Sequence, residues 1–142
     1  EKQSAAFQSL ARSIVDDALE AAAREDVSVS ISSGDVALSA EEATPVVLIM
    51  LECVNNALEH AFPDRPGRIT IELCDDGSAR TLVIADDGVG VSDAPPSEPG
   101  SLGLRIITAL TRQLGGEWSL RSADPGASAR LCWPSSAASR QV

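Results

Sequence analysis

The protein has 142 residues, of which 44% are hydrophobic and 23% are charged, and this balance is typical of one globular domain. Its formal net charge of −10 argues against a surface that binds nucleic acid or an anionic membrane. The sequence contains no signal peptide and no apolar run of bilayer length. We therefore expect a cytoplasmic domain. Because the chain begins at Glu1 without a methionine, we expect either a piece of a longer protein or a chain from which a tag has been cleaved.

The first quarter of the chain predicts a helix followed by a strand. Apolar residues recur at three- and four-residue steps across residues 4–24, which is the spacing of one buried helix face. Strict alternation over Val27–Ile31 predicts a strand with one buried side. We expect a turn at Gly34-Asp35 and a short return strand over Val36–Leu38.

A long helix is expected next. Residues 39–42 have the form of a capping box, which we interpret as a helical turn that precedes the main helix. We place Thr44 as the cap of the main helix and Pro45 in its first turn. The apolar stripe then continues to about Phe62, where a segment rich in proline and glycine ends it.

The second half of the chain predicts four strands and one helix. Alternation and turn residues place the strands at 69–73, 81–85, 117–122 and 127–133, and the helix between Gly100 and Gly115. Residues 91–99 contain three prolines and are expected to form a loop. We expect one domain over residues 1–134 and a disordered tail over residues 135–142.

The three cysteines, Cys53, Cys74 and Cys132, lack the spacing of metal ligands. Each falls within an apolar element. We therefore expect reduced and buried thiols.

One stretch of the main helix carries a row of polar side chains beside its apolar stripe. Glu52, Asn56 and His60 are four residues apart, so they line one face of the helix. An acid, an amide and an imidazole in a row are able to hold a hydrated divalent cation, since Mg²⁺ takes oxygen ligands and keeps several waters. Taken alone, the row is more simply interpreted as the solvated face of an amphipathic helix.

Two glycine motifs follow in the second half of the chain. Asp86-x-Gly88-x-Gly90 comes directly after a strand, where the carboxylate is able to accept a hydrogen bond from an exocyclic amine and the glycines allow close backbone approach. Gly100-Ser101-Leu102-Gly103-Leu104 opens a helix, whose free amides and dipole favour an anion. Alone, each motif is equally consistent with an ordinary turn or helix cap.

The order of these three motifs is more specific than any one of them. It resembles the GHKL family of ATPases, with Glu52–His60 similar to the N box, Asp86–Gly90 to the G1 box and Gly100–Leu104 to the G2 box. The resemblance extends over roughly residues 10–134. The amino-acid sequence is most similar to bacterial sensor kinases with a HisKA_2-type dimerisation domain, close to the HWE group, over residues 55–63, 67–71 and 101–116.

The resemblance implies an α+β Bergerat fold, in which a mixed, mostly antiparallel sheet carries three main helices on one face and an ATP lid precedes the third helix. It implies ATP and Mg²⁺ as ligands. Asn56 would ligate Mg²⁺, Glu52 would be catalytic by ordering a water or polarising the attacking imidazole, and Asp86 would recognise the adenine amine. The other nucleotide-binding positions that it implies are His60, Gly88, Gly90, Gly100, Leu102, Gly103, Leu104 and Ser128.

The function implied is that of the catalytic domain of a two-component sensor histidine kinase, which delivers the γ-phosphate of ATP to a histidine. That histidine would lie on a dimerisation domain outside this chain, because His60 is the only histidine of the sequence and belongs to the N box. The implied partners are this dimerisation domain and a response regulator, and homodimers are expected only in the full-length protein.

The sequence departs from the family pattern in ways that keep two alternatives open. Glu59 stands where the family often has lysine, and the segment between the glycine motifs contains no Lys or Arg. Both changes reduce the positive charge near the phosphates. One alternative is therefore a degenerate docking module, or a phosphotransferase that does not use ATP. The other is an anti-sigma-factor serine kinase, which has the same fold and a similar size.

Overall fold

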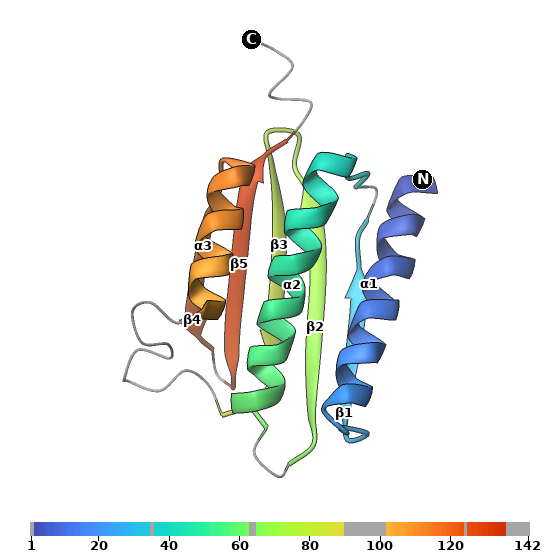
Figure 1. The fold of residues 1–142 in the computed structure, drawn as a ribbon, viewed down its shortest axis with the longest axis vertical. Coiled ribbons are helices and arrows are strands. Elements are labelled where there is room, and N and C mark those ends of the chain that lie inside the picture. Colours follow the sequence, from blue (N-terminus) through green and yellow to red (C-terminus); the bar gives the residue numbers. More distant parts are fainter. Residues whose placement is uncertain (1, 35, 63–64, 90–101, 124, 136–142) are drawn as a thin grey trace.

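The computed structural model describes residues 2–34, 36–62, 65–89, 102–123 and 125–135, and these form two layers. Three described helices cover one face of a five-stranded sheet, and no described helix covers the other face, called the open face below (Figure 1). In chain order the elements are α1 Lys2–Ala21, β1 Val27–Ser32, α2 Ala40–His60, β2 Gly67–Asp75, β3 Ala79–Asp86, α3 Leu102–Leu114, β4 Glu117–Ser122 and β5 Ala127–Pro134. The expected α+β fold class, with helices on one face of a mixed sheet, is confirmed.

The strand order is β1-β2-β3-β5-β4. β1 and β2 are parallel, and the other three pairs are antiparallel. A parallel pair needs a long crossover connection, which α2 supplies here. This crossover lays α2 across the middle of the sheet, between α1 and α3 (Figure 1).

The core lies between the helices and one face of the sheet. Alternate residues of the strands point into it, such as Ile69, Ile71 and Leu73 of β2, which are at most 2% exposed. From α2, Ile49 and Val54 belong to the same core and are fully buried. With only four aromatic residues in the chain, this layer is built mainly from aliphatic side chains.

The main helix begins earlier than the sequence predicts. Ser39 is its cap: the Ser39 side chain accepts from the N–H of Glu42, and the Glu42 carboxylate accepts from the N–H of Ser39. The capping box therefore starts α2 itself, and the prediction of Thr44 as the cap is wrong. Pro45 is the sixth residue of the helix, where its missing N–H removes the i→i−4 hydrogen bond to the Glu41 carbonyl, and its ring is buried in the core.

The prediction of a short return strand over Val36–Leu38 is wrong. Residues 36–39 have no regular structure, and Asp35 lies outside the described residues. Val36 and Leu38 are nevertheless buried, at 3% and 8% exposed. Their alternation reflects two side chains inserted into the core by the segment that leads into α2, with no partner strand.

A buried polar network joins the N-terminus of α2 to the sheet. The Arg80 guanidinium of β3 donates to Glu42 Oε1 at 2.6 Å and to Asp75 Oδ2 at 2.9 Å. Trp133 Nε1 of β5 donates to Glu42 Oε2 at 2.7 Å. Since the side chains of Arg80 and Glu42 are only 8% and 12% exposed, this ion pair is largely removed from water.

The described cysteine side chains differ in their exposure to solvent. The prediction of buried cysteines holds for Cys53 but is wrong for Cys74, which is exposed on the open face of the sheet.

Ser135 is fully buried, and its N–H donates to Ser78 O at 3.0 Å. Residues 136–142 lie outside the described residues, so the disordered tail stays a prediction. None of the described helices is long and apolar enough to cross a membrane.

Candidate functional site

The polar stretch of α2 divides into buried and exposed positions as its periodicity predicts. Cys53 and Val54 face the core, and burial raises the pKa of the Cys53 thiol to about 12. Glu52 is half-buried, while Asn56 and His60 are exposed. The three polar side chains are therefore accessible on the helix surface, as a ligand site requires.

The second glycine motif packs against the beginning of this stretch. A Cβ atom added at Gly103, in the first turn of α3, would lie 2.8 Å from Glu52 Oε2 and 3.0 Å from Glu52 Cδ. Any other residue at position 103 would displace the Glu52 carboxylate, because a Cβ atom does not come so close to another heavy atom. Glu52 and the N-terminus of α3 are thus direct neighbours.

The first glycine motif packs against the end of the same stretch. The N–H of Val89 donates to Ala61 O at 2.9 Å, and Ala61 is the residue that caps the C-terminus of α2. A Cβ atom at Gly88 would collide with the Ala61 carbonyl, so a side chain there would push β3 and α2 apart. The two glycine motifs therefore contact the two ends of the polar stretch of α2.

Asp86 lies at the end of β3, beside this contact. One of its carboxylate oxygens, Oδ1, accepts from the N–H of Gly88 at 2.9 Å. Burial raises the pKa of Asp86, and the neighbouring charge of Asp87 adds to this, although hydrogen bonds from the N–H groups of Gly88 and Ala127 oppose it. A half-buried carboxylate loses part of its hydration, and a hydrogen-bond donor from a ligand would compensate for that loss.

The other predicted site residues fall into three groups. Gly90 and Gly100 lie outside the described residues, and of Leu102 only the helical backbone is described. Leu104 is half-buried in the first turn of α3, and the His60 imidazole is exposed, 3.5 Å from the Glu59 carboxylate. Ser128 is opposite Ala85 in the sheet and alternates with buried Ala129, so it lies on the open face.

Sequence reasoning missed the residues that border Asp86 from β5. Ala127 is opposite Asp86 in the β3–β5 register and lies on the helix-covered face of the sheet. Ser128 lies on the other face. Gly126, with φ of 91°, packs directly against the Asp86 backbone, and a Cβ atom there would meet it. The Asp-Pro-Gly turn before β5 was visible in the sequence, but only the register of β5 on β3 shows that it borders Asp86.

The donor set fits a magnesium ion held mainly by a bound phosphate. The described residues contain no group of three or more His, Cys, Asp or Glu side chains that could cage a metal. Mg²⁺ commonly takes one or two protein oxygens and fills its remaining positions with phosphate and water. The exposed amide of Asn56 and the half-buried carboxylate of Glu52 match that pattern.

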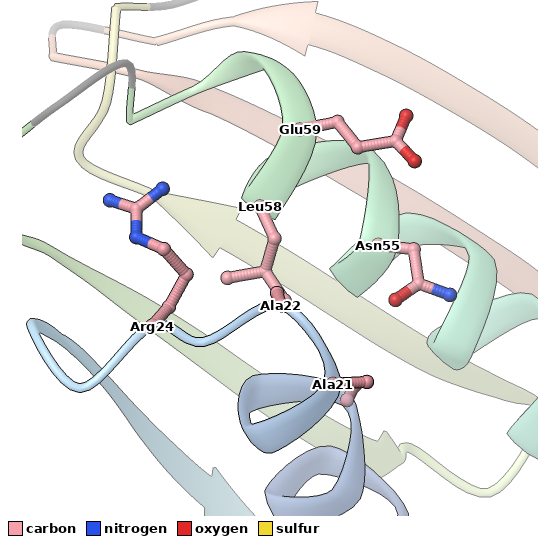
Figure 2. Close-up of a pocket in the computed structure, with 7 residues that line it drawn as sticks. Ala21, Ala22, Arg24, Asn55, Leu58 and Glu59 are labelled. Carbon is pink, nitrogen blue, oxygen red and sulfur yellow. The ribbon is translucent and has the colours of Figure 1, made fainter.

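A cavity of about 480 Å³ lies elsewhere, between α1 and α2 (Figure 2). Asn55, Leu58 and Glu59 line it from α2, on the side that faces Ala18 and Ala21 of α1. Among the described residues that line it, Arg24 is the cation, and it donates to the Asp26 carboxylate at 2.9 Å and to the Arg65 carbonyl at 2.8 Å. The cavity is therefore separate from the glycine motifs, which contact α2 from the side of α3.

Comparison with known protein families decides the family. The model of the histidine kinase-like ATPase domain matches residues 11–133, which is most of the chain. The chain belongs to this family. The GHKL resemblance inferred from the order of the three motifs is confirmed.

Curated relatives of this histidine kinase-like ATPase domain are sensor kinases. The chain is 35% identical over 90 residues to the sensor histidine kinase PdtaS of Mycobacterium tuberculosis, covering 61% of this chain and 18% of PdtaS. It is 30% identical over 107 residues to the blue-light-activated histidine kinase 2 of Erythrobacter litoralis, covering 72% of this chain and 31% of that protein. This chain thus spans less than a third of the length of either relative.

Solved structures agree with this assignment. The histidine kinase domain of the Erythrobacter litoralis blue-light-activated kinase EL346 superposes with a TM-score of 0.79 at 26% identity, over 94% of this chain and 63% of that chain. The catalytic domain of the histidine kinase ThkA superposes with a TM-score of 0.69 at 16% identity, over 89% of this chain and 92% of that one. The second likeness, at this low identity, concerns the fold alone.

Proposed function

We propose that this domain binds Mg-ATP and delivers the γ-phosphate to a histidine on a separate dimerisation domain of a two-component sensor kinase. The observation that carries the proposal is the pair of contacts on α2. Gly103 packs on Glu52, and Gly88 and Val89 pack on Ala61, so the three motifs border one region.

In this proposal each motif meets a different part of the nucleotide. The Asp86 carboxylate accepts a hydrogen bond from the adenine amine, since it is half-buried and a donor there would offset its desolvation. Gly88 keeps the end of β3 close to α2, and the first-turn amides of α3 at Gly103 and Leu104 face the phosphates. Gly90, Gly100 and Leu102 would extend these two contacts.

The polar stretch of α2 supplies the metal and catalytic groups of the proposed site. Asn56 supplies an amide oxygen to Mg²⁺, which neutralises charge on the phosphates when bound. Glu52 orders a water or polarises the incoming imidazole, and its position beside Gly103 keeps it near the phosphate end. Catalysis of phosphoryl transfer then consists mainly of positioning and charge stabilisation.

One observation favours a second candidate, a docking domain with a degenerate nucleotide site. The Glu59 carboxylate lies 3.5 Å from His60 Nε2, on the same helix as Asn56. The Glu59 charge stands where related sequences often have a lysine, so α2 lacks a cation that would attract phosphate, although Glu59 itself lines the cavity on the α1 side. In this second candidate the domain binds a protein partner without ATP.

The test supplies a histidine-bearing dimerisation domain of a related sensor kinase to this domain with γ-labelled Mg-ATP. We expect acid-labile phosphate on that histidine, which a response regulator then removes. Label on a serine of a partner, stable in acid, would instead indicate an anti-sigma-factor serine kinase. If no phosphate is transferred and the domain binds no nucleotide, the second candidate, a docking domain, would be favoured.

A further inference from the structure

The two edge strands of the sheet, β1 and β4, differ in whether their outer backbone groups are hydrogen-bonded by the described residues. At the β1 edge, the Arg12 guanidinium of α1 donates from Nη1 and Nη2 to Val29 O, at 2.9 and 3.0 Å. Asp26 O accepts from Gly67 N–H of β2, so alternation along the strand directs the Val29 carbonyl to the outer side of β1. This edge is therefore closed to another strand by a side chain of the same molecule.

At Trp118 and Leu120 the β4 edge has no such closure from the described part of the chain. The N–H of Ala123 donates to Gly126 O at 2.8 Å, which fixes the phase of the β4–β5 ladder. By alternation, Ser119 directs its backbone groups to β5, and Trp118 and Leu120 direct theirs to the outer side. β4 ends the strand order, so the backbone of these two residues meets no neighbouring strand among the described elements.

The sequence of β4 is complementary to itself in the antiparallel sense. Around Ser119 as a centre, Glu117 is opposite Arg121 and Trp118 is opposite Leu120. The outward backbone groups of Trp118 and Leu120 then form a hydrogen-bonded pair. Glu117 and Arg121 fall in non-hydrogen-bonded positions, where opposite side chains approach most closely.

We propose that β4 pairs with β4 of a second copy of this chain, antiparallel and centred on Ser119. The paired sheets then form one continuous sheet, with α3 of each copy near the junction, since α3 packs over β4 and β5 (Figure 1). Two Glu117–Arg121 pairs cross the two-fold axis on the open face. Trp118 and Leu120 extend the half-buried apolar row on the helix-covered face.

The charges select a second copy over an unrelated partner. Protected edge strands usually carry charges that repel an approaching strand. Here the two charges of β4 are of opposite sign and are spaced so that self-pairing brings each one to its complement. Like charges at these two positions would have opposed the same pairing.

The experiment is sedimentation velocity of the whole 142-residue chain over a concentration series that reaches millimolar. We expect reversible dimers. Arg121→Glu should weaken the association by about tenfold or more, because each pair becomes Glu opposite Glu. The double change Glu117→Arg with Arg121→Glu should restore it, since the pairs are again opposite in sign.

Arg112→Glu, at the exposed end of α3, is the matched control because it alters the net charge equally. Circular dichroism and thermal melting check that each variant folds. In the parent dimer, hydrogen exchange at the amides of Trp118 and Leu120 should slow with concentration.

A parent chain that stays monomeric at every concentration would overturn the proposal. So would an Arg121→Glu variant that dimerises like the parent, or a charge-exchanged variant that does not recover. None of these results depends on nucleotide, so Mg-ATP binding by Arg121→Glu is expected to equal that of the parent, and the two proposals fail separately.

Discussion

At the scale of single residues, Asp86 is the group whose environment is hardest to explain without a ligand. It has a half-buried carboxylate, one neighbouring charge of the same sign at Asp87, and hydrogen bonds from two backbone amides that only partly offset its burial. A carboxylate in such a position destabilises the fold in its charged form. An amine donor from a ligand would offset this cost.

Asp86→Asn should therefore separate binding from stability. We expect affinity for adenine nucleotides to fall about 10- to 100-fold, since a hydrogen bond to a charged group contributes ~1.5–3 kcal/mol. Calorimetric titration measures this. The matched control is Asp87→Asn, because the Asp87 carboxylate is exposed and accepts from the backbone N–H of Arg68.

The stability of the same variant has a defined pH dependence. Because the folded pKa of Asp86 is raised above its ordinary 3.8, the native state binds more protons than the unfolded state between these two values. Its contribution to stability thus falls as pH rises through that window. Asp86→Asn does not titrate, so it should be at least as stable as the parent at neutral pH and lose that advantage in acid. A variant that melts well below the parent at pH 7 would contradict the assigned role.

Part of this residue-level picture was accessible from the sequence. The position of Asp86 at a strand end, followed by two glycines, identified it as a candidate. The packing of Gly103 on Glu52 and the neighbourhood of Gly126 were not accessible, because each joins residues far apart in the chain. Ser128 shows the same limit, since only the strand register tells which face it occupies.

At the scale of elements, α2 is held at both ends. Its C-terminus accepts from Val89 through the Ala61 carbonyl, and its N-terminus enters the network of Glu42, Arg80 and Trp133. The position of the polar stretch on the sheet depends on these anchors. Alternation and helical periodicity predicted most elements, but the start of α2 was misplaced because Pro45 suggested a first turn that Ser39 in fact provides.

Arg80→Ala should destabilise the fold by about 3–5 kcal/mol at pH 7, because it leaves the buried Glu42 carboxylate without its cation. Chemical denaturation measures the change. Arg130→Ala is the matched control on the exposed face of β5, and we expect a change within about 0.5 kcal/mol.

The effect of Arg80→Ala should also shrink in acid. Burial alone would raise the pKa of Glu42, but hydrogen bonds from Trp133 and Ser39 and the charge of Arg80 together lower it below its ordinary 4.5. A lowered folded pKa gives stability that is present above 4.5 and lost as pH falls through the folded value. If the difference between the parent and Arg80→Ala stayed constant from neutral pH into acid, the ion pair would not be its cause.

At the scale of the whole molecule, topology brings the motifs together. The crossover from β1 to β2 orients α2 so that it ends where β3 ends and α3 begins (Figure 1). The order of the motifs in the sequence indicated this family fold, but a single sequence could not provide the strand order. Because phosphate would approach a molecule with a net charge of −10, we expect the proposed nucleotide binding to depend on a divalent cation.

The most direct measurement is a calorimetric titration of the chain with ATP, with and without Mg²⁺, on the parent, Asn56→Asp and Asn55→Asp. We expect saturable binding by the parent that requires Mg²⁺. Asn56→Asp should lose affinity by at least about tenfold without a change in melting temperature, because a carboxylate there repels the phosphates. Asn55 lines the cavity on the α1 side of the same helix, so Asn55→Asp should bind like the parent. No heat from the parent at millimolar Mg-ATP, or equal binding by the parent and Asn56→Asp, would contradict a nucleotide site on this face of α2.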